Sequence, residues 1–398
     1  MRILMVHNDY GRYSGEEAVV DQLIADGRKA GIYIETLRRT SKFSRDNFIG
    51  KVHGFISGMY SFSGVLMMRE AIRTFQPDIV HIHNLYPFIS PSALFECKKA
   101  NIPVVMTVHN YRLLCPTGLF LRNGHPCEEC LVKHSEMPCI KYRCEGSLIQ
   151  SIGYAFRNHR SRKSGAYMKC VDYFCCLTEF QKNKLIEGGY PPEKMFVFPN
   201  YVKIQRHFDE DERDIPVSER KYVGYVGRLS EEKGYDLLLE VARRHPEIQF
   251  EYAGAFRDPT DEEQLPNVVF HGVLDQKALS EFYRNSRFVV IPSRCYEGFP
   301  IVMLESFGYG RTCIAPNHGA FPDLMQYEGH PSGLLFTPSD VDSLEEAVLD
   351  LWNDTSRIEM LQRTALEEMA HRFCKRNINK QWDVFLKKVA GGSGEIRD

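Results

Sequence analysis

The 398-residue sequence has no apolar run that approaches the roughly 18 residues of a membrane-spanning helix. It also has little net charge, because 50 Lys and Arg stand against 52 Asp and Glu, for a formal charge of −2. Any attraction to nucleic acid or membrane must therefore be local. The opening MRILMVHN has too short a hydrophobic stretch for a signal peptide and is typical of a first buried strand. We expect a cytoplasmic protein that does not bind nucleic acid.

A hydrophobic content of 43% and a charged content of 26% are typical of globular proteins, and the length favours two domains. The twelve cysteines are expected to be thiols or metal ligands, because a protein that is not exported stays in a reducing compartment.

Short runs rich in β-branched residues alternate with helical patterns, which indicates parallel strands joined by crossover helices. In the first half the expected strands are RILMVHN, IYIETL, DIVHIHN, IPVVMTVHN, CVDYFCCLT and MFVFPN, and EEAVVDQLIADGRKAG is an expected helix. After a charged segment at 201–221 that suits a linker, YVGYVG, IQFEYAG, VVFHGV, RFVVIPS and TCIAPN repeat the pattern. The sequence thus predicts an α/β protein with two doubly wound domains, 1–200 and 201–372. It is expected to be helical from about Asp340, with a helix at about 373–390 returning to the first domain.

Ligands of such folds bind at the carboxyl ends of the strands. There, VGRLSEEKG (226–234) places Arg228 and Lys233 in a loop before a helix, where two cations suit a diphosphate. The alternative is a solvated loop in which Glu231 and Glu232 neutralise both charges.

The stretch EGFPIVMLE places Glu297 at the end of another strand and Glu305 inside a helix. Gly298 allows an unusual backbone conformation, and Pro300 suits the first helical position. A carboxylate at Glu305 among apolar neighbours is costly to bury without partners, which favours a ligand's hydroxyl groups as its partners. The free N–H groups at the helix start would attract an anion. The alternative is an amphipathic helix with one glutamate in solvent.

Taken together, TVHN, PNYV, GRLSEEKG, EGFPIVMLESFGYG, CIAPNHGAFPDL and GLLF resemble, in this order, the retaining nucleotide-sugar-dependent glycosyltransferases of family 4. The resemblance covers most of the chain and implies the GT-B fold. It implies transfer of a hexosyl or related group from a UDP-sugar, with a GDP-sugar as the second choice, to a lipid-linked or glycan acceptor in cell-surface polysaccharide synthesis. A GT-B-fold nucleotide-sugar epimerase is the alternative.

The resemblance also implies roles for single residues. Arg228 and Lys233 would hold the donor diphosphate and stabilise the leaving group, and Glu305 would bind the ribose. Glu297 would contact hydroxyl groups of the transferred sugar, aided by the backbone around Gly298, Phe299 and Ile301. Preorganised charges of this kind can supply most of the rate acceleration. Asp209-Glu210-Asp211 lies in the linker's charge run, so we expect no catalytic divalent metal.

In the first half, the resemblance places His109 of TVHN near the transferred sugar and Gly15 near the donor diphosphate. Ser14 departs from the family's paired glycines. A hydrogen-bonded histidine at a strand end is the alternative for His109. His83 is a weaker candidate near the acceptor, and His81 can simply brace the sheet. Glu16 and Glu17 suit the first turn of a helix, and we assign them no catalytic role.

An insert at 115–147 interrupts the α/β pattern. Cys127, Cys130, Cys139 and Cys144 have the spacing C-x2-C-x8-C-x4-C, which suits a structural zinc ion. Free thiols and disulfides are the alternatives, and Cys175, Cys176 and Cys313 are expected to be core residues.

The next segment, 141–169, contains seven Lys or Arg and one Glu, interleaved with apolar residues. It suits peripheral contact with anionic lipid at the inner membrane face, or a solvated helix packed on its own domain. The cysteines and the basic segment together would also fit a zinc-containing nucleic-acid-binding module, but that hypothesis leaves both wound domains unexplained.

Overall fold

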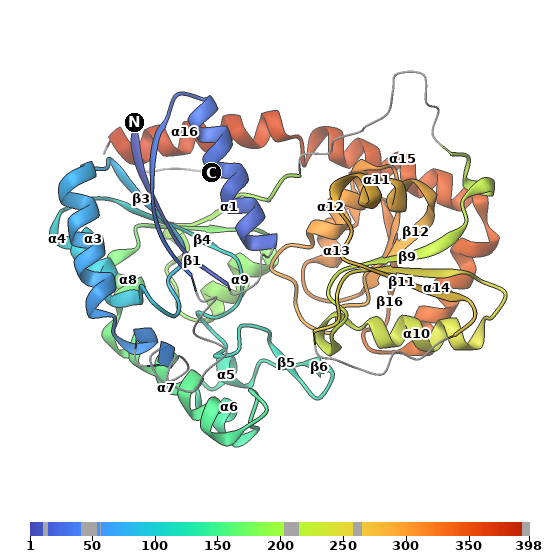
Figure 1. Cartoon of the computed structure of the whole chain (residues 1–398), viewed down its shortest axis with the longest axis horizontal. Helices are drawn as coiled ribbons and strands as arrows, with labels where there is room; N and C mark the ends of the chain where they lie inside the picture. Colours follow the sequence, from blue (N-terminus) through green and yellow to red (C-terminus); the bar gives the residue numbers. More distant parts are fainter. Residues whose placement is uncertain (11–14, 41–53, 56, 203–214, 258–264, 392–398) are drawn as a thin grey trace. The chain divides into compact units, whose positions relative to one another are not determined.

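A computed structural model gives the fold of the chain (Figure 1), and it describes all residues except 11–14, 41–53, 56, 203–214, 258–264 and 392–398. Ser14, the linker motif Asp209-Glu210-Asp211 and most of the C-terminal tail lie outside the described residues. The chain forms two compact units. Unit 1 comprises Met1–Gly118, Glu128–Asn200 and Asn379–Asp398, and unit 2 comprises Leu119–Cys127 and Tyr201–Ile378.

Unit 1 contains a six-stranded parallel sheet in the order β2-β1-β3-β4-β7-β8. Its strands are β1 (Arg2–Asp9), β2 (Tyr33–Thr40), β3 (Ile79–Asn84), β4 (Val104–Val108), β7 (Tyr173–Cys176) and β8 (Met195–Val197). Its helices are α1 (Gly15–Lys29), α3 (Phe62–Phe75), α4 (Leu94–Lys99), α5 (Glu129–Val132), α6 (Met137–Lys141), α7 (Leu148–Ser164), α8 (Ala166–Cys170) and α9 (Glu179–Glu187).

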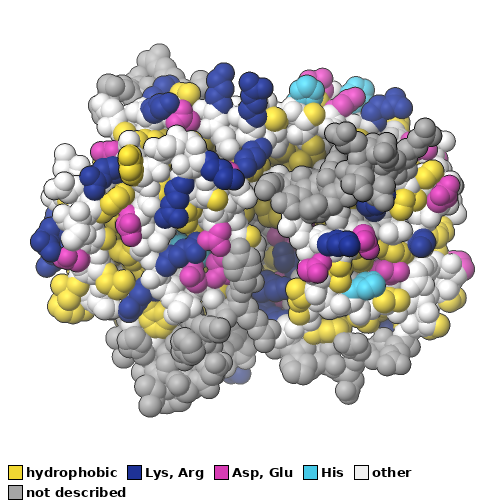
Figure 2. All heavy atoms as spheres, turned by 45° about the horizontal axis from the view of Figure 1, so that its top comes forward, with side chains coloured by type: hydrophobic (Ala, Val, Ile, Leu, Met, Phe, Trp, Pro, Cys, Tyr) yellow, Lys and Arg dark blue, Asp and Glu magenta, His cyan; other side chains and the backbone are white. Residues whose placement is uncertain are grey.

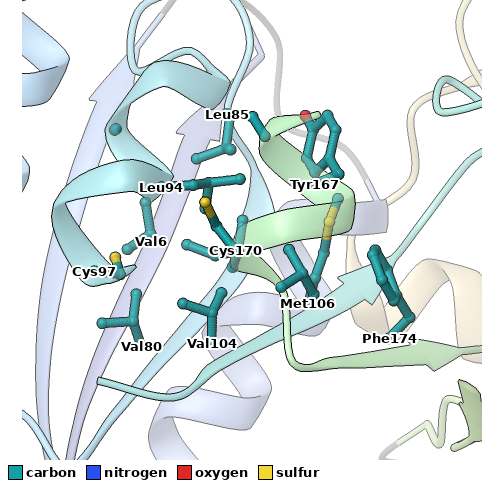
Figure 3. Packing of buried hydrophobic residues seen from close by; sticks show 14 of the residues in the cluster. Val6, Val80, Leu85, Leu94, Cys97, Val104, Met106, Tyr167, Cys170 and Phe174 are labelled. Carbon is teal, nitrogen blue, oxygen red and sulfur yellow. The ribbon is translucent and has the colours of Figure 1, made fainter. Parts of the chain in front are cut away.

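The sheet of unit 1 buries both of its faces, as parallel sheets do. Because side chains alternate along a strand, Leu4 and Val6 of β1 pack with α3, α4 and α8, where Figure 3 shows the cluster around Val6, Leu94 and Cys170. Ile3 and Met5 face the other way and pack with α1 and with α16 (Lys375–Gly391). The C-terminal helix is thus part of the core of unit 1.

Unit 2 contains a second six-stranded parallel sheet in the order β11-β10-β9-β12-β13-β16. Its strands are β9 (Tyr222–Val226), β10 (Phe250–Ala253), β11 (Val268–Gly272), β12 (Ser286–Val290), β13 (Cys313–Pro316) and β16 (Gly333–Phe336). Its helices are α10 (Tyr235–Arg244), α11 (Gln276–Asn285), α12 (Ile301–Gly308), α13 (Phe321–Leu324), α14 (Val341–Asn353) and α15 (Thr355–His371). Two short hairpins pair β5 (Leu121–Arg122) with β6 (His125–Pro126) and β14 (Gln326–Tyr327) with β15 (His330–Pro331).

The α/β prediction with two doubly wound sheets is confirmed, and every run predicted as a strand contains one. The sequence analysis did not predict β16 as a strand, although it named GLLF among the motifs of the resemblance. It also kept the whole insert 115–147 in the first domain, whereas the structure groups Leu119–Cys127 with unit 2. The segment 201–221, which the sequence analysis treated as a linker, has buried residues at its ends. These are Tyr201, Val217 and Arg220, each at most 8% exposed.

Candidate active site

In each sheet the strand order reverses at one place, and the loops there carry the candidate residues. In unit 2 the reversal falls between β9 and β12. The loop after β9 begins at Gly227, whose φ of 147° is in the region that favours glycine. The Tyr225 hydroxyl, from β9, donates to the Arg228 carbonyl (2.7 Å) and so ties the loop to the strand.

The loops after β9 and β12 meet at a part-buried ion pair. Lys233 Nζ donates to both carboxylate oxygens of Glu297, at 2.6 and 2.9 Å, and the Ser293 hydroxyl donates to one of them. The two loops approach closely because Gly234 has a φ of 68°, and a Cβ there would lie 2.0 Å from the Pro292 carbonyl oxygen. The structure thus brings together two residues that are 64 positions apart in the sequence.

The ion pair keeps both groups charged. Burial would raise the pKa of Glu297, but Lys233, Ser293 and Arg228 outweigh burial and lower it. Burial likewise opposes the charge of Lys233, yet the adjacent Glu297 carboxylate raises the Lys233 pKa. The site therefore presents a fixed cation beside a fixed carboxylate, which is suited to a ligand with both a phosphate and hydroxyl groups.

Arg228 is more exposed than Lys233, with 61% of its side chain accessible against 27%. It pairs with Glu232 at 3.2 Å, and Arg257 shares the same carboxylate oxygen at 3.2 Å. The solvated-loop alternative is therefore correct in one respect, since Glu232 does pair with Arg228. Lys233, by contrast, turns away from Glu231 and Glu232 and toward Glu297.

The segment between Glu297 and Glu305 differs in detail from the prediction. Gly298 is not among the residues with positive φ, and Pro300 precedes the first helical residue instead of occupying that position. The Ile301 N–H already donates to the Phe299 carbonyl (3.0 Å), so it is not a free donor for an anion. A hydrogen bond to the carbonyl two residues earlier closes a γ-turn.

Glu305 is inside α12 and accepts a hydrogen bond from the Tyr283 hydroxyl (2.9 Å). Burial raises its pKa, and the Tyr283 bond only partly opposes this shift. The Tyr283 ring stacks on Tyr309 with a centroid distance of 5.1 Å, so the donor of this bond is itself held in place. Glu305 is thus a half-buried, oriented carboxylate, as its apolar neighbours in the sequence suggested.

In unit 1 the strand order reverses between β1 and β3, and a histidine-rich cluster lies there. His7 Nδ1 is 2.6 Å from Asp9 and Nε2 is 3.1 Å from Glu16. Because both ring nitrogens face carboxylates, which accept only, the geometry favours the imidazolium form. Burial would lower the pKa of His7, but Glu16 and Asp9 outweigh it and raise it. Tyr10 also donates to Glu16, at 2.9 Å.

The second part of this cluster is neutral. His83 Nδ1 and His109 Nε2 are 2.8 Å apart, so one donates and the other accepts. Burial lowers the pKa of both rings, although the Glu16 carboxylate partly opposes the shift at His109. His81 bonds to Thr107 (2.8 Å) and packs on Trp382, which supports the bracing role considered for it.

Sequence reasoning missed His7, Asp9 and Glu16 as members of one cluster. Glu16 was interpreted only as a first-turn residue of α1, but its carboxylate is 11% exposed and faces His7. The one available signal was their position at the end of β1 and at the start of the next helix. Gly15 begins that helix, and no described atom beyond its own helix backbone and chain neighbours lies within 4 Å of the place where its Cβ would be.

The zinc prediction is not supported. Among the residues that the structure describes, which include all four cysteines of the motif, no group of three or more His, Cys, Asp or Glu is placed to hold a metal ion. The motif is divided, because Cys127 belongs to the part of the insert that packs with unit 2 and Cys130 to unit 1. Cys139 and Cys144 do lie together with Cys130 and Cys115 nearby, and the Cys144 thiol, burial and these neighbouring thiols raise the pKa of Cys139. Cys175, Cys176 and Cys313 are core residues, as predicted.

The basic segment forms α7 and α8. Leu148, Ile149, Ile152 and Phe156 of α7 are exposed, Ile149 by 84%. Part of the positive charge is already engaged, since Arg162 pairs with Glu136 (2.8 Å). No helix in the described part of the chain is long and apolar enough to cross a membrane. On the face of the molecule shown in Figure 2, side chains of both charges are interspersed.

Comparisons with known proteins agree with the fold and with these motifs. A sequence model of Glycosyltransferase Family 4 matches residues 14–206, and one of glycosyl transferases group 1 matches residues 208–370. An uncharacterized 42.6 kDa protein in the cps region of Klebsiella pneumoniae is 25% identical over 286 residues, which are 71% of this chain and 69% of that protein.

Two solved structures share the fold over almost the whole chain. Sucrose-phosphate synthase from Thermosynechococcus elongatus aligns with a TM-score of 0.72 at 16% identity, covering 98% of this chain and all of that one. Anabaena HepE in complex with UDP aligns with a TM-score of 0.65 at 16% identity and the same coverage.

Two parallel six-stranded sheets with these motifs define a glycosyltransferase of the GT-B fold. The chain belongs to glycosyltransferase family 4, the glycosyl transferases of group 1, and is a retaining enzyme that uses a nucleotide sugar.

Proposed function

We propose that the protein transfers a sugar from a UDP-sugar to a lipid-linked or glycan acceptor during synthesis of a cell-surface polysaccharide. The observation that carries the donor part is the Lys233–Glu297 pair at the reversal of strand order in unit 2. The UDP complex of the structurally similar HepE favours UDP over GDP, and the similar Klebsiella protein of the cps region favours a polysaccharide acceptor.

The residues of unit 2 fit the charges that develop during the reaction. Breaking the bond between sugar and phosphate places negative charge on the leaving diphosphate, which Lys233 and Arg228 would stabilise. Glu297, held charged by Lys233, would accept hydrogen bonds from the transferred sugar. Glu305 would do the same for the ribose. Retention is consistent with attack by the acceptor from the face that the diphosphate leaves, and Glu297 then needs no nucleophilic role.

The first test is a panel of UDP- and GDP-sugars, with thermal stabilisation and release of free nucleoside diphosphate as readouts. A specific donor raises the apparent stability by RT ln(1 + [L]/Kd). Glu305→Gln keeps an oxygen for the Tyr283 bond and should lose most of the transfer activity at an unchanged melting temperature. Glu281→Gln, on the exposed side of α11, is the matched control. Near-normal turnover of Glu305→Gln would remove Glu305 from the donor site.

The same panel separates transfer from epimerisation. With an acceptor present, a transferase yields a glycosidic product and one nucleoside diphosphate per transfer. An epimerase instead yields an isomerised nucleotide sugar without net release. Isomerised donor as the main product would overturn the proposal in favour of the epimerase.

We further propose that α7 contacts an anionic membrane surface peripherally, where a lipid-linked acceptor would be found. Ile149, Ile152 and Phe156 are exposed and spaced along one side of the helix, and Arg160 and Lys163 continue that side with positive charge. The exposed apolar side chains would enter the acyl region of a bilayer, and the basic side chains would contact its anionic headgroups.

The membrane contact is tested by sedimentation with vesicles. Binding is expected with phosphatidylglycerol vesicles, to be weak with phosphatidylcholine alone, and to fall in Ile149→Ser. The control Val132→Ser changes an apolar residue that is 72% exposed on α5 of the same unit. Equal binding by both variants, or no preference for the anionic lipid, would contradict the assignment of α7.

A further inference from the structure

The hairpin β5–β6 comes from the cysteine-containing insert but packs within unit 2. Its turn is Asn123-Gly124, with φ of 50° and 75°, the pair of residues that a tight two-residue turn favours. The Cys127 N–H donates to the Phe120 carbonyl (2.7 Å) and closes the base. The hairpin is thus a defined element, for which neither the family nor the proposed chemistry supplies a role.

The hairpin packs against the loop that carries Glu297. The Phe120 side chain is fully buried, and its ring meets the edge of Tyr296 with a centroid distance of 5.9 Å. At the tip, Ser339 Oγ donates to the Gly124 carbonyl (2.7 Å). Gly124 also lies beside Arg294, since a Cβ at Gly124 would be in ordinary van der Waals contact with the Arg294 Cδ and Nε atoms, at 3.7 Å. Both contacted loop residues, 294 and 296, are within three positions of Glu297.

These two loop residues connect to the rest of the site. Arg294 is 9% exposed and forms two 2.6 Å bonds to Asp236, together with one of 3.0 Å to the Glu231 carbonyl in the Lys233 turn. On the other side, the Tyr296 ring packs on His318 with a centroid distance of 5.4 Å.

His318 completes the connection to the catalytic carboxylate. Its Nε2 lies 3.0 Å from the Ser293 carbonyl, and the hydroxyl of Ser293 donates to Glu297. The hairpin therefore packs against a short loop whose other contacts are the Lys233 turn and the carboxylate itself. A side chain held from several sides in this way has little freedom to leave its productive position.

We infer that Phe120 is a positioning residue for the donor site and that, through Tyr296, it sets the orientation of Glu297 opposite Lys233. The inference rests on the proposed function, because it assigns to Glu297 a role in the reaction. Phe120 itself is not expected to touch the donor. Its effect should therefore appear in turnover more than in nucleotide affinity, since a small displacement of a catalytic group lowers the rate steeply.

The test uses full-length variants and two measurements: the Kd of UDP, and kcat and KM with the UDP-sugar that the donor panel identifies. Phe120→Leu retains an apolar side chain and limits the loss of stability that truncation to alanine would cause. We expect kcat to fall about tenfold and the Kd of UDP to change less than about twofold. Ser339→Ala, which removes one bond at the hairpin tip, should lower kcat by about two- to threefold.

Two controls separate positioning from general destabilisation. Phe250→Leu shortens an equally buried ring in β10, away from the hairpin and the Glu297 loop, and should lower the melting temperature without lowering kcat. In a double-mutant cycle, Phe120→Leu and Tyr296→Leu should be clearly less than additive in kcat, because they act on one contact.

The outcomes are decisive in both directions. A kcat for Phe120→Leu equal to that of Phe250→Leu, or full additivity with Tyr296→Leu, would overturn the inference. If Glu297→Gln is inactive while Phe120→Leu has a normal kcat, only this inference fails. If Glu297→Gln retains full activity, the proposed role of Glu297 fails first, and the inference with it.

Discussion

The two sheets have almost the same architecture, yet the sites at their carboxyl ends are built from different chemistry. Unit 2 uses Lys233 and Arg228, which form ion pairs with Glu297 and Glu232. Unit 1 uses histidines, one of which is held between Asp9 and Glu16. Fixed charge is suited to a diphosphate, which is an anion at every physiological pH. Groups that donate and accept hydrogen bonds are suited to hydroxyl groups.

The loops that follow the strands also differ between the two units in how closely their backbones pack. In unit 2 three loop glycines allow close approach: Gly227, Gly234, and Gly254, where a Cβ would lie 1.8 Å from the Gly227 carbonyl oxygen. The loops of that unit are consequently packed on one another and rigidly placed. In unit 1, no described atom outside its own helix backbone and chain neighbours lies within 4 Å of the place where a Cβ of Gly15 would be. On the proposed function, the packed loops of unit 2 would fix the donor diphosphate.

The largest expected effect is on the ion pair of unit 2. Lys233→Ala should lower transfer by about 10²- to 10³-fold, as for the loss of one preorganised donor, and weaken UDP binding. Arg228→Ala should cost less on both measures, because its side chain is more exposed and is shared with Glu232. Steady-state kinetics and calorimetric UDP titration measure both effects. Equal losses of activity and UDP affinity in the two variants would contradict the distinction between Lys233 as the less exposed cation and Arg228 as the more exposed one.

A control for Lys233→Ala is needed because the variant leaves Glu297 buried without its main partner. Removing one partner of a buried pair typically costs about 3–5 kcal/mol. Glu297→Gln in the Lys233→Ala background removes the unpaired charge and should recover melting temperature. Activity should remain lost, which would show that the effect on turnover is not caused by unfolding.

The sequence predicts the unit 2 site better than the unit 1 site for a physical reason. Arg228, Lys233, Glu297 and Glu305 lie in two short segments where each strand, loop and helix start can be identified from local pattern alone. The pairing of Lys233 with Glu297 was not predicted, since it depends on which two strands are neighbours. The zinc prediction is left without support, and cysteine spacing did not reveal that Cys127 groups with unit 2 and Cys130 with unit 1.

In unit 1 the signal is spread over the chain. His7 and His83 lie near the ends of β1 and β3, His109 follows β4, and Glu16 is in the first turn of α1. No two of them belong to one motif. The hairpin at Phe120 was overlooked although Asn123-Gly124 is a strong turn signal, because its strands have only two residues each. Such elements become visible only when their tertiary contacts are known.

An intermediate effect is expected at His109. His109→Asn should lower kcat by about 10- to 100-fold if the ring touches the reacting groups, while the Kd of UDP should stay unchanged because the proposed function assigns the diphosphate to Lys233 and Arg228 of unit 2. His81→Asn is the control in the neighbouring strand, where the ring faces Thr107 and Trp382. It should lower stability and spare kcat. A weakened UDP affinity in His109→Asn would contradict the division of labour between the units.

The smallest expected effect is a pH dependence at His7 in unit 1. The pKa of His7 is raised above its ordinary value of 6.5. Its imidazolium therefore contributes stability that is fully present below pH 6.5 and is lost as the pH rises through the folded-state pKa. Asp9→Asn removes one of the two carboxylates that raise this pKa, so the variant should melt below the wild type in acid and approach it in mild alkali.

The ion pair of unit 2 has no such dependence over this range. Glu297 has a pKa below its ordinary 4.5 and Lys233 one above 10.5, so neither changes charge between pH 6 and 9. Thermal melts of wild type, Asp9→Asn and Glu297→Gln across this range measure the contrast. The difference between wild type and Asp9→Asn should shrink with rising pH, by a few °C for each kcal/mol lost, and that of Glu297→Gln should stay constant. A pH-independent Asp9→Asn difference would mean that His7 is neutral and that the two sites do not differ in this property.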